Sequence, residues 1–151
     1  MKKIIVLLLT VVYMHAENDN RVTAEYGVTW IGSYGAIYYD NKLSEHWSFR
    51  SGLNVKPEEW AGTDDLNNTY DGWYGMELGF SYKLGSILPD EKIHVFVNAT
   101  LLIGVYSNQE KDLIGFPWLT ASAYYEVDET FYIGVSTFLL QSISLSLQHN
   151  F

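Results

Sequence analysis

The most constraining feature of this sequence is a strict two-residue alternation of side-chain types, which is clearest between residues 93 and 106. Every odd position of this stretch is aliphatic, whereas the even positions mix histidine, asparagine, threonine and glycine with larger apolar residues. Successive side chains of a β-strand point to opposite faces, so this period predicts a strand with one wholly apolar face. Similar runs cover residues 46–56, 72–84, 116–126, 130–140 and 142–151, and no helical period follows residue 16. The chain is therefore predicted to be all-β.

The segments between these runs predict an even number of strands. Residues 40–45, 85–92 and 126–130 read as short turns, and residues 56–72 and 107–115 read as long loops. A bacterial outer-membrane barrel has short periplasmic turns, longer outer loops and an even strand count. This pattern fits if residues 22–39 form two strands, 22–31 and 34–39, joined by a tight turn at Gly32-Ser33. We therefore predict an eight-stranded antiparallel transmembrane β-barrel over residues 17–151.

The uniform apolar faces indicate the environment of the barrel. The strand charges Glu25, Arg50, Glu77, Lys83 and Glu126 all fall on the other face. An apolar band of this extent is not expected on a soluble monomer, whereas a charge facing lipid at the bilayer midplane costs about 2–4 kcal/mol. A soluble lipocalin-like barrel is the alternative, and it would place the apolar residues inside. The last run, 142–151, ends on phenylalanine and is expected to close the barrel, which leaves no unpaired strand edge in lipid.

The first sixteen residues, MKKIIVLLLTVVYMHA, have the layout of a secretory signal peptide, with two lysines before a short apolar run. A buried N-terminal strand or helix is the alternative. Removal of residues 1–16 takes away two lysines and no acidic residue, so the formal net charge changes from −9 to −11. This acidity argues against nucleic-acid binding. The chain has no cysteine and no metal-ligand motif, so we expect neither a disulfide nor a metal or other cofactor.

The lumen-facing residues divide by their height in the predicted barrel. The periplasmic half is polar and contains His46, His94 and Arg50, with Glu77 near the middle. Arg50 and Glu77 lie on adjacent strands and are candidates for a charge pair. The outer half is apolar with interspersed glycines, which is the composition that an acyl-chain pocket needs. The alternative is that the aromatic residues simply fill the barrel. The candidate pocket residues are Ile31, Gly52, Trp73, Gly75, Leu102, Gly104, Phe116, Trp118 and Phe138.

The C-terminal half, about residues 72–151, resembles the PagP family of outer-membrane lipid A palmitoyltransferases. The resemblance rests on the stretches DEKIHVFVNATLLIGVYS and GFPWLTASAYYE and on a final strand that ends in phenylalanine. It implies an eight-stranded barrel that measures an acyl chain in its outer lumen and transfers a palmitoyl group from a phospholipid to lipid A without a cofactor. The catalytic residues of the family are not matched. Ile31 follows Thr29-Trp30 where the family has histidine, and the residues before Trp60 do not supply the Asp-Ser pair.

Two function hypotheses follow for a monomeric barrel in the bacterial outer membrane. In the first, the barrel handles acyl chains or lipid A in the outer leaflet, either as a diverged acyltransferase or without chemistry. Glu58 and Glu59 are then candidate replacement bases, because acyl transfer needs a group that activates the acceptor hydroxyl. In the second, the barrel is a non-enzymatic structural or surface-interaction protein. The same glutamates would then be solvated charge, or part of an acidic rim that holds divalent cations between lipopolysaccharide phosphates.

Overall fold

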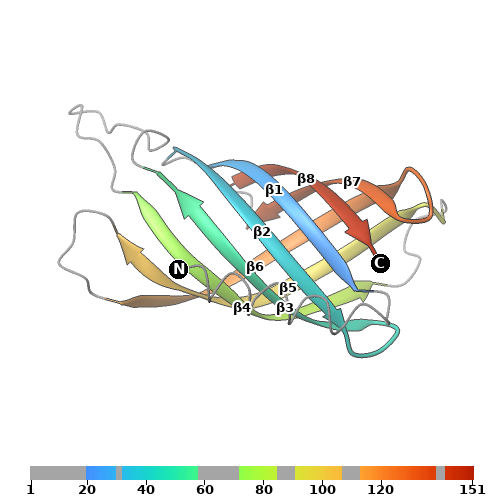
Figure 1. Ribbon diagram of the computed structural model, residues 1–151, viewed down its shortest axis with the longest axis horizontal. Coiled ribbons are helices and arrows are strands. Elements are labelled where there is room, and N and C mark those ends of the chain that lie inside the picture. Colours follow the sequence, from blue (N-terminus) through green and yellow to red (C-terminus); the bar gives the residue numbers. More distant parts are fainter. Residues whose placement is uncertain (1–19, 30–31, 58–71, 85–90, 107–112, 139–141) are drawn as a thin grey trace.

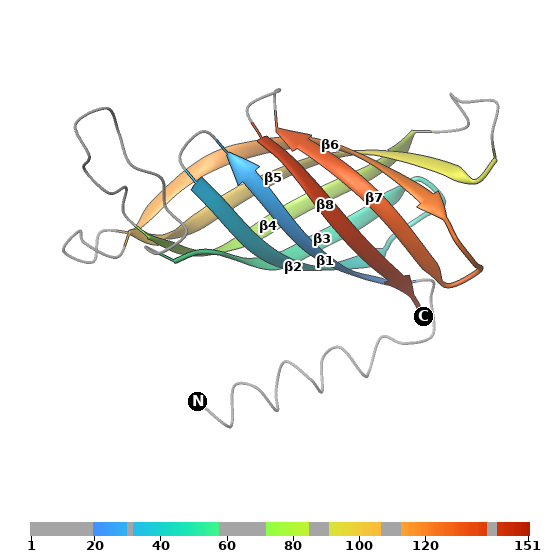
Figure 2. The same cartoon turned by 90° about the horizontal axis from the view of Figure 1, so that it is seen from above.

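The computed structural model describes residues 20–29, 32–57, 72–84, 91–106, 113–138 and 142–151. In these residues eight antiparallel strands form one closed barrel (Figures 1 and 2). The predicted all-β, eight-stranded architecture is therefore confirmed. The strands are β1 (Arg21–Thr29), β2 (Gly32–Lys42), β3 (Trp47–Lys56), β4 (Trp73–Leu84), β5 (Ile93–Tyr106), β6 (Ile114–Glu126), β7 (Phe131–Phe138) and β8 (Ser142–Asn150).

The barrel is closed by the pairing of its first and last strands. β8 is antiparallel to β1, with a register that runs from Arg21 opposite Asn150 to Thr29 opposite Ser142. Each of the other strands pairs with its neighbours in sequence, so no strand in the described residues is left as the edge of a sheet. Closure satisfies the backbone N–H and C=O groups that an open edge would expose. This is the role that the alternating C-terminal run was expected to have.

The alternation of side chains produces an apolar exterior and a polar lumen. On β8 the outward residues Ile143 and Leu145 are 70% and 65% exposed, whereas the inward Ser144 is only 2% exposed. The charged residues expected in the lumen do face it, since Arg50 and Glu77 are buried and Lys83 is paired with the buried Phe96 in the ladder. The predicted assignment of faces is therefore confirmed. Among the described residues no helix is long and apolar enough to cross a membrane.

The boundary between the first two strands differs from the prediction. Thr29 pairs directly with Gly32, so the connection is residues 30–31 rather than Gly32-Ser33, and β2 continues to Lys42 rather than ending at residue 39. Gly32 has a φ of 122°, a conformation that glycine adopts without steric cost. The strand end was misplaced because Asp40 and Asn41 are typical turn residues. Asp40 instead faces the lumen, where Arg50 lies opposite it.

Several lumen glycines make room for aromatic rings of the neighbouring strand. A Cβ atom on Gly27 would collide with the ring of Tyr34, and a Cβ atom on Gly134 would collide with the ring of Tyr124. Tyr34 and Tyr124 are both buried. An eight-stranded barrel has a lumen just wide enough for side chains to fill it. Each glycine therefore lets a large ring lie flat against the barrel wall.

The turn between β6 and β7 is fixed by one carboxylate. Asp128 accepts hydrogen bonds from the backbone N–H groups of Thr130 and Phe131, at 2.8 and 2.9 Å, and from the Thr130 hydroxyl at 3.0 Å. The hydrogen bonds from Thr130, and then from Phe131, hold the pKa of Asp128 below its usual value. A short turn of this kind is what the sequence predicts at residues 126–130.

Gly79 and Gly115 provide a matched test of how tightly the barrel wall is packed. A Cβ atom on Gly79 would collide with the backbone carbonyl oxygen of Ala99, whereas the atom closest to a Cβ on Gly115 is Cγ1 of Ile103, at 3.8 Å. We expect Gly79→Ala to lower the free energy of unfolding by about 1–3 kcal/mol. Gly115→Ala is expected to change it by less than about 0.5 kcal/mol. Urea unfolding in lipid vesicles measures both, and equal stability of the two variants would contradict this packing.

Candidate functional site

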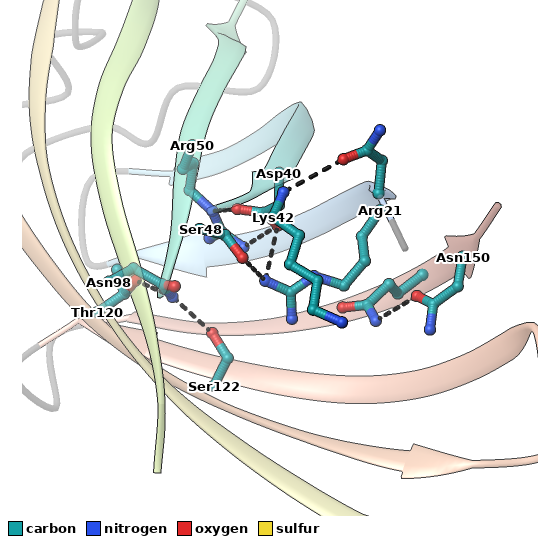
Figure 3. A network of polar contacts seen from close by, with 11 residues as sticks. Arg21, Asp40, Lys42, Ser48, Arg50, Asn98, Thr120, Ser122 and Asn150 are labelled. Atoms are coloured by element: carbon teal, nitrogen blue, oxygen red, sulfur yellow. Dashed lines mark hydrogen bonds and ion pairs between the residues drawn. The ribbon is translucent and has the colours of Figure 1, made fainter. Parts of the chain in front are cut away.

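A buried ion pair lies in the lumen between β2 and β3. The guanidinium of Arg50 donates two hydrogen bonds to the carboxylate of Asp40, at 2.8 and 2.9 Å, and lies 4.7 Å from the ring centroid of Tyr38. Arg21 approaches the same carboxylate at 3.8 Å and donates a hydrogen bond to the Ser48 hydroxyl at 3.1 Å (Figure 3). Asp40 is completely buried. A carboxylate in this position is stable because a bidentate arginine compensates its desolvation.

The prediction of a charge pair between Arg50 and Glu77 is wrong. Arg50 forms its ion pair with Asp40, which lies directly opposite it in the ladder between β2 and β3. Glu77 lies opposite Gly52 instead, and its carboxylate accepts a hydrogen bond of 2.7 Å from the Thr100 hydroxyl. The difference follows from the greater length of β2, because a strand that ended at residue 39 would not have brought Asp40 into the lumen.

Other polar side chains of the lumen form hydrogen-bonded groups of their own. Tyr34 donates its hydroxyl hydrogen to Glu25 at 2.7 Å. Asn98 donates to the hydroxyls of Thr120 and Ser122, both at 3.0 Å (Figure 3). Side chains thus fill the middle of the lumen, as expected for eight strands. We define the polar plug as these residues together with Asp40, Arg50, Tyr38, Glu77 and Thr100.

An apolar cavity of about 90 Å³ lies at the end of the lumen toward residues 29, 56, 73 and 106; we call it the outer cavity. Four predicted pocket residues, Trp73, Leu102, Phe116 and Trp118, come together in its wall. The three aromatic rings pack against one another, with centroids 5.5 Å apart for Trp73 and Phe116 and 5.9 Å apart for Phe116 and Trp118. The other lining residues are Thr29, Tyr34, Asn54, Lys56 and Tyr106.

The three glycines predicted for the pocket have protein rings over them. A Cβ atom on Gly52 would collide with Tyr38. Cβ atoms on Gly75 and Gly104 would lie 2.8 and 2.7 Å from atoms of the Trp73 indole. These glycines therefore accommodate the aromatic wall rather than leaving open lumen. The volume that remains is below the roughly 300–1,000 Å³ of typical ligand pockets. The cavity could therefore hold no more than the end of a hydrocarbon chain.

The remaining predicted site residues are not placed at the outer cavity by the described part of the molecule. Ile31, Glu58 and Glu59 lie outside the described residues, and Phe138 is described only as the last residue of β7. Sequence reasoning missed Tyr34, Asn54 and Lys56 in the cavity wall. The parity of Arg50 and Gly52 on β3 places Asn54 and Lys56 on the same lumen face, so the signal for these two residues was present.

The histidines of the described residues lie away from the outer cavity. His46 and His94 line a second, polar cavity at the end of the barrel that carries Arg21 and Asn150. Nε2 of His94 lies 3.1 Å from a carboxylate oxygen of Glu126. The described residues that line the outer cavity include neither histidine nor carboxylate. In the described part of the chain no group of three or more histidine, cysteine or acidic residues is placed to hold a metal ion.

Comparison with known proteins supports the fold. No protein-family model matches this chain, and no curated protein matches its sequence. Among solved structures, a de novo designed transmembrane β-barrel is similar with a TM-score of 0.59 at 10% identity, over 89% of this chain and 96% of that chain. The described barrel therefore has the fold of a small transmembrane β-barrel, as the sequence predicts.

Two structures of Ail, the attachment invasion locus protein of Yersinia pestis, are also similar. One of them is a complex with the heparin analogue sucrose octasulfate. Both are 8% identical to this chain and cover 88% of it and 96% of their own length. The TM-scores are 0.41 for the complex and 0.33 for the protein alone.

The ion pair between Asp40 and Arg50 gives a testable stability difference. Asp40→Asn leaves Arg50 buried without its counter-ion, so we expect the free energy of unfolding to fall by about 3–5 kcal/mol. The double variant Asp40→Asn, Arg50→Met removes both charges and is expected to recover at least half of that loss. Urea unfolding in vesicles measures each variant. A double variant no more stable than Asp40→Asn would contradict an unpaired-charge penalty.

Proposed function

We propose that the protein is a bacterial outer-membrane barrel that handles lipid in the outer leaflet, by holding the end of an acyl chain in its outer cavity. The observation that carries this proposal is the apolar wall formed by Trp73, Leu102, Phe116 and Trp118 at one end of an otherwise polar lumen. A hydrocarbon end placed there leaves water and contacts aromatic surface, which is favourable by about 25 cal/mol per Å² of buried apolar area.

The orientation of the barrel supports an outer-leaflet site. The described turn at residues 43–46 and the turn at residues 127–130 are short and lie at the end of the barrel that carries Arg21 and Asn150. Short turns are periplasmic in barrels of this class. The opposite end, where the outer cavity lies, then faces the outer leaflet. Outward aromatic residues such as Trp47 and Tyr82, with ring centroids 4.7 Å apart, fit the girdle at the periplasmic interface.

The described residues support acyl-chain binding better than acyl transfer. Acyl transfer needs a base close to the acceptor hydroxyl, and the described wall of the outer cavity offers Lys56 but neither histidine nor carboxylate. Glu58 and Glu59 follow Lys56 closely in sequence and remain the candidates for such a base. In this proposal the chain is a diverged or inactive counterpart of the PagP-like acyltransferases.

A second candidate function is a structural or surface-interaction barrel, and the filling of the lumen favours it. In the described residues, the polar plug and the rings over Gly52, Gly75 and Gly104 fill most of the lumen beside an outer cavity of about 90 Å³. In this case the acidic segment 56–72 would make the functional contacts. The two candidates differ in whether hydrocarbon enters the lumen.

Photo-crosslinking tests acyl-chain entry directly. The folded protein is placed in vesicles of a phospholipid that carries a diazirine at the end of one acyl chain, and crosslinked peptides are identified by mass spectrometry. We expect crosslinks at Leu102 and Trp118. Leu102→Trp fills the cavity and should lower these lumen crosslinks about tenfold, the ratio that 1.4 kcal/mol of lost binding free energy produces.

The adjacent variant Leu101→Trp is the matched control, because Leu101 is exposed on the outer surface whereas Leu102 is buried. It should leave the lumen crosslinks unchanged. Crosslinks confined to outward residues such as Leu101 and Leu119 would refute acyl-chain entry and favour the surface-interaction barrel.

Lipid A mass spectrometry separates binding from transfer. The chain is expressed in a Gram-negative host that lacks its own palmitoyltransferase, and its arrival in the outer membrane is confirmed. We expect unchanged lipid A, because the described cavity wall has neither histidine nor carboxylate. A mass gain of one acyl chain would show transfer by residues elsewhere, and Glu58→Gln and Glu59→Gln would then show whether either glutamate is required.

A further inference from the structure

A polar cavity of about 310 Å³ lies at the end of the lumen opposite the outer cavity; we call it the vestibule. Its wall brings together basic residues that are far apart in sequence: Arg21 on β1, Lys42 on β2, Lys83 on β4, and the histidines His46 and His94. Its volume is at the lower end of the range of small-molecule sites. Nothing in the proposed lipid-binding function uses it.

Arg21 is fixed in the vestibule wall by contacts on two sides. It is buried, its guanidinium lies 4.2 Å from the ring centroid of Phe96, and it donates a hydrogen bond of 3.1 Å to Ser48. A guanidinium has five N–H donors, so these contacts leave it further donors. Because the ring and the hydroxyl already hold the side chain, little conformational entropy would be lost when an anion binds.

The vestibule wall carries three cationic side chains, Arg21, Lys42 and Lys83, and two exposed glutamates, Glu45 and Glu129. Two further carboxylates lie close to it. That of Asp40 accepts two hydrogen bonds from Arg50 and lies 3.8 Å from Arg21, and that of Glu126 lies 3.1 Å from His94. Among the described residues no carboxylate forms an ion pair with Lys83. In a chain of formal charge −9, the vestibule wall thus carries one more positive than negative side chain.

We propose that the vestibule binds a phosphate group. Arginine and lysine together recognise phosphate, since the guanidinium fork donates two parallel hydrogen bonds and the ammonium adds a point charge. His46 also lines the vestibule, and its Nδ1 is buried and has no hydrogen-bond partner in the described residues. Arg21, Lys83 and His46 are the residues that carry the site, and Lys42 contributes charge at its rim.

The phosphate has two possible sources, which share this chemistry. It is either a soluble phosphate or pyrophosphate from the periplasmic side, or the headgroup of a phospholipid in the adjacent leaflet. The site does not depend on the proposed acyl-chain function, because the polar plug lies between the vestibule and the outer cavity.

Isothermal titration calorimetry on the full chain, folded in a neutral, phosphate-free detergent, tests the proposal. Inorganic phosphate and pyrophosphate are titrated at constant ionic strength, with chloride as the reference, and short-chain phosphatidylglycerol is titrated separately. We expect saturable binding of at least one of these phosphate probes. A response to the lipid alone would assign the site to a headgroup, and a response to soluble phosphate would assign it to a soluble ligand. The absence of saturable binding by all three would overturn the proposal.

Lys83→Gln and Lys92→Gln form the matched pair of variants. Lys92 is exposed in the turn before β5 and is not in the vestibule wall, so both variants remove one positive charge from the same end of the barrel. Lys83→Gln should weaken phosphate binding about tenfold, or about 1.4 kcal/mol, whereas Lys92→Gln should leave it within about twofold. Equal effects would show nonspecific charge attraction and overturn the site. The faster gel migration of unheated protein verifies that each variant is folded.

Discussion

Closure of the backbone ladder between β1 and β8 is the constraint on which the rest of this structure depends. Because eight strands enclose a lumen only about as wide as its side chains, every inward residue must fit against those of the other strands. The strand charges are also directed inward, since the exterior is apolar. The paired Asp40 and Arg50 and the rings packed over glycines are two consequences of this one restriction.

The lumen has two cavities of different character, one at each end of the barrel. The outer cavity is apolar and lined by indole and phenyl rings, whereas the vestibule is polar and basic. Between them lies the polar plug, whose side chains are held by hydrogen bonds of 2.7–3.0 Å. Two different ligand chemistries are therefore offered at the two ends.

Much of the fold follows from the period of the sequence, whereas the shape of the site does not. The alternation along residues 93–106 and 142–151 was enough to predict the strands, their faces and closure by β8. It failed at Asp40, because a buried aspartate resembles a turn residue until its partner Arg50 is known. Trp73 and Leu102, predicted for one pocket, do line the same cavity, but the space beside a glycine depends on which cross-strand neighbour faces it. That neighbour is set by register, which sequence alone does not fix.

The distribution of titratable groups restricts what chemistry a bound acyl chain would meet. His94 and Glu126 form a pair whose composition suits proton transfer, yet they lie at the vestibule end, beyond the polar plug. A chain end in the outer cavity is surrounded by Trp73, Phe116 and Trp118, and a general base must come within hydrogen-bond reach of the proton it takes. Acyl transfer, if it were catalysed here, would need a base from outside the described wall, and Glu58 and Glu59 follow β3 in sequence. Without such a base, the proposed binding would depend on apolar fit and on the buried Lys56 in the same wall.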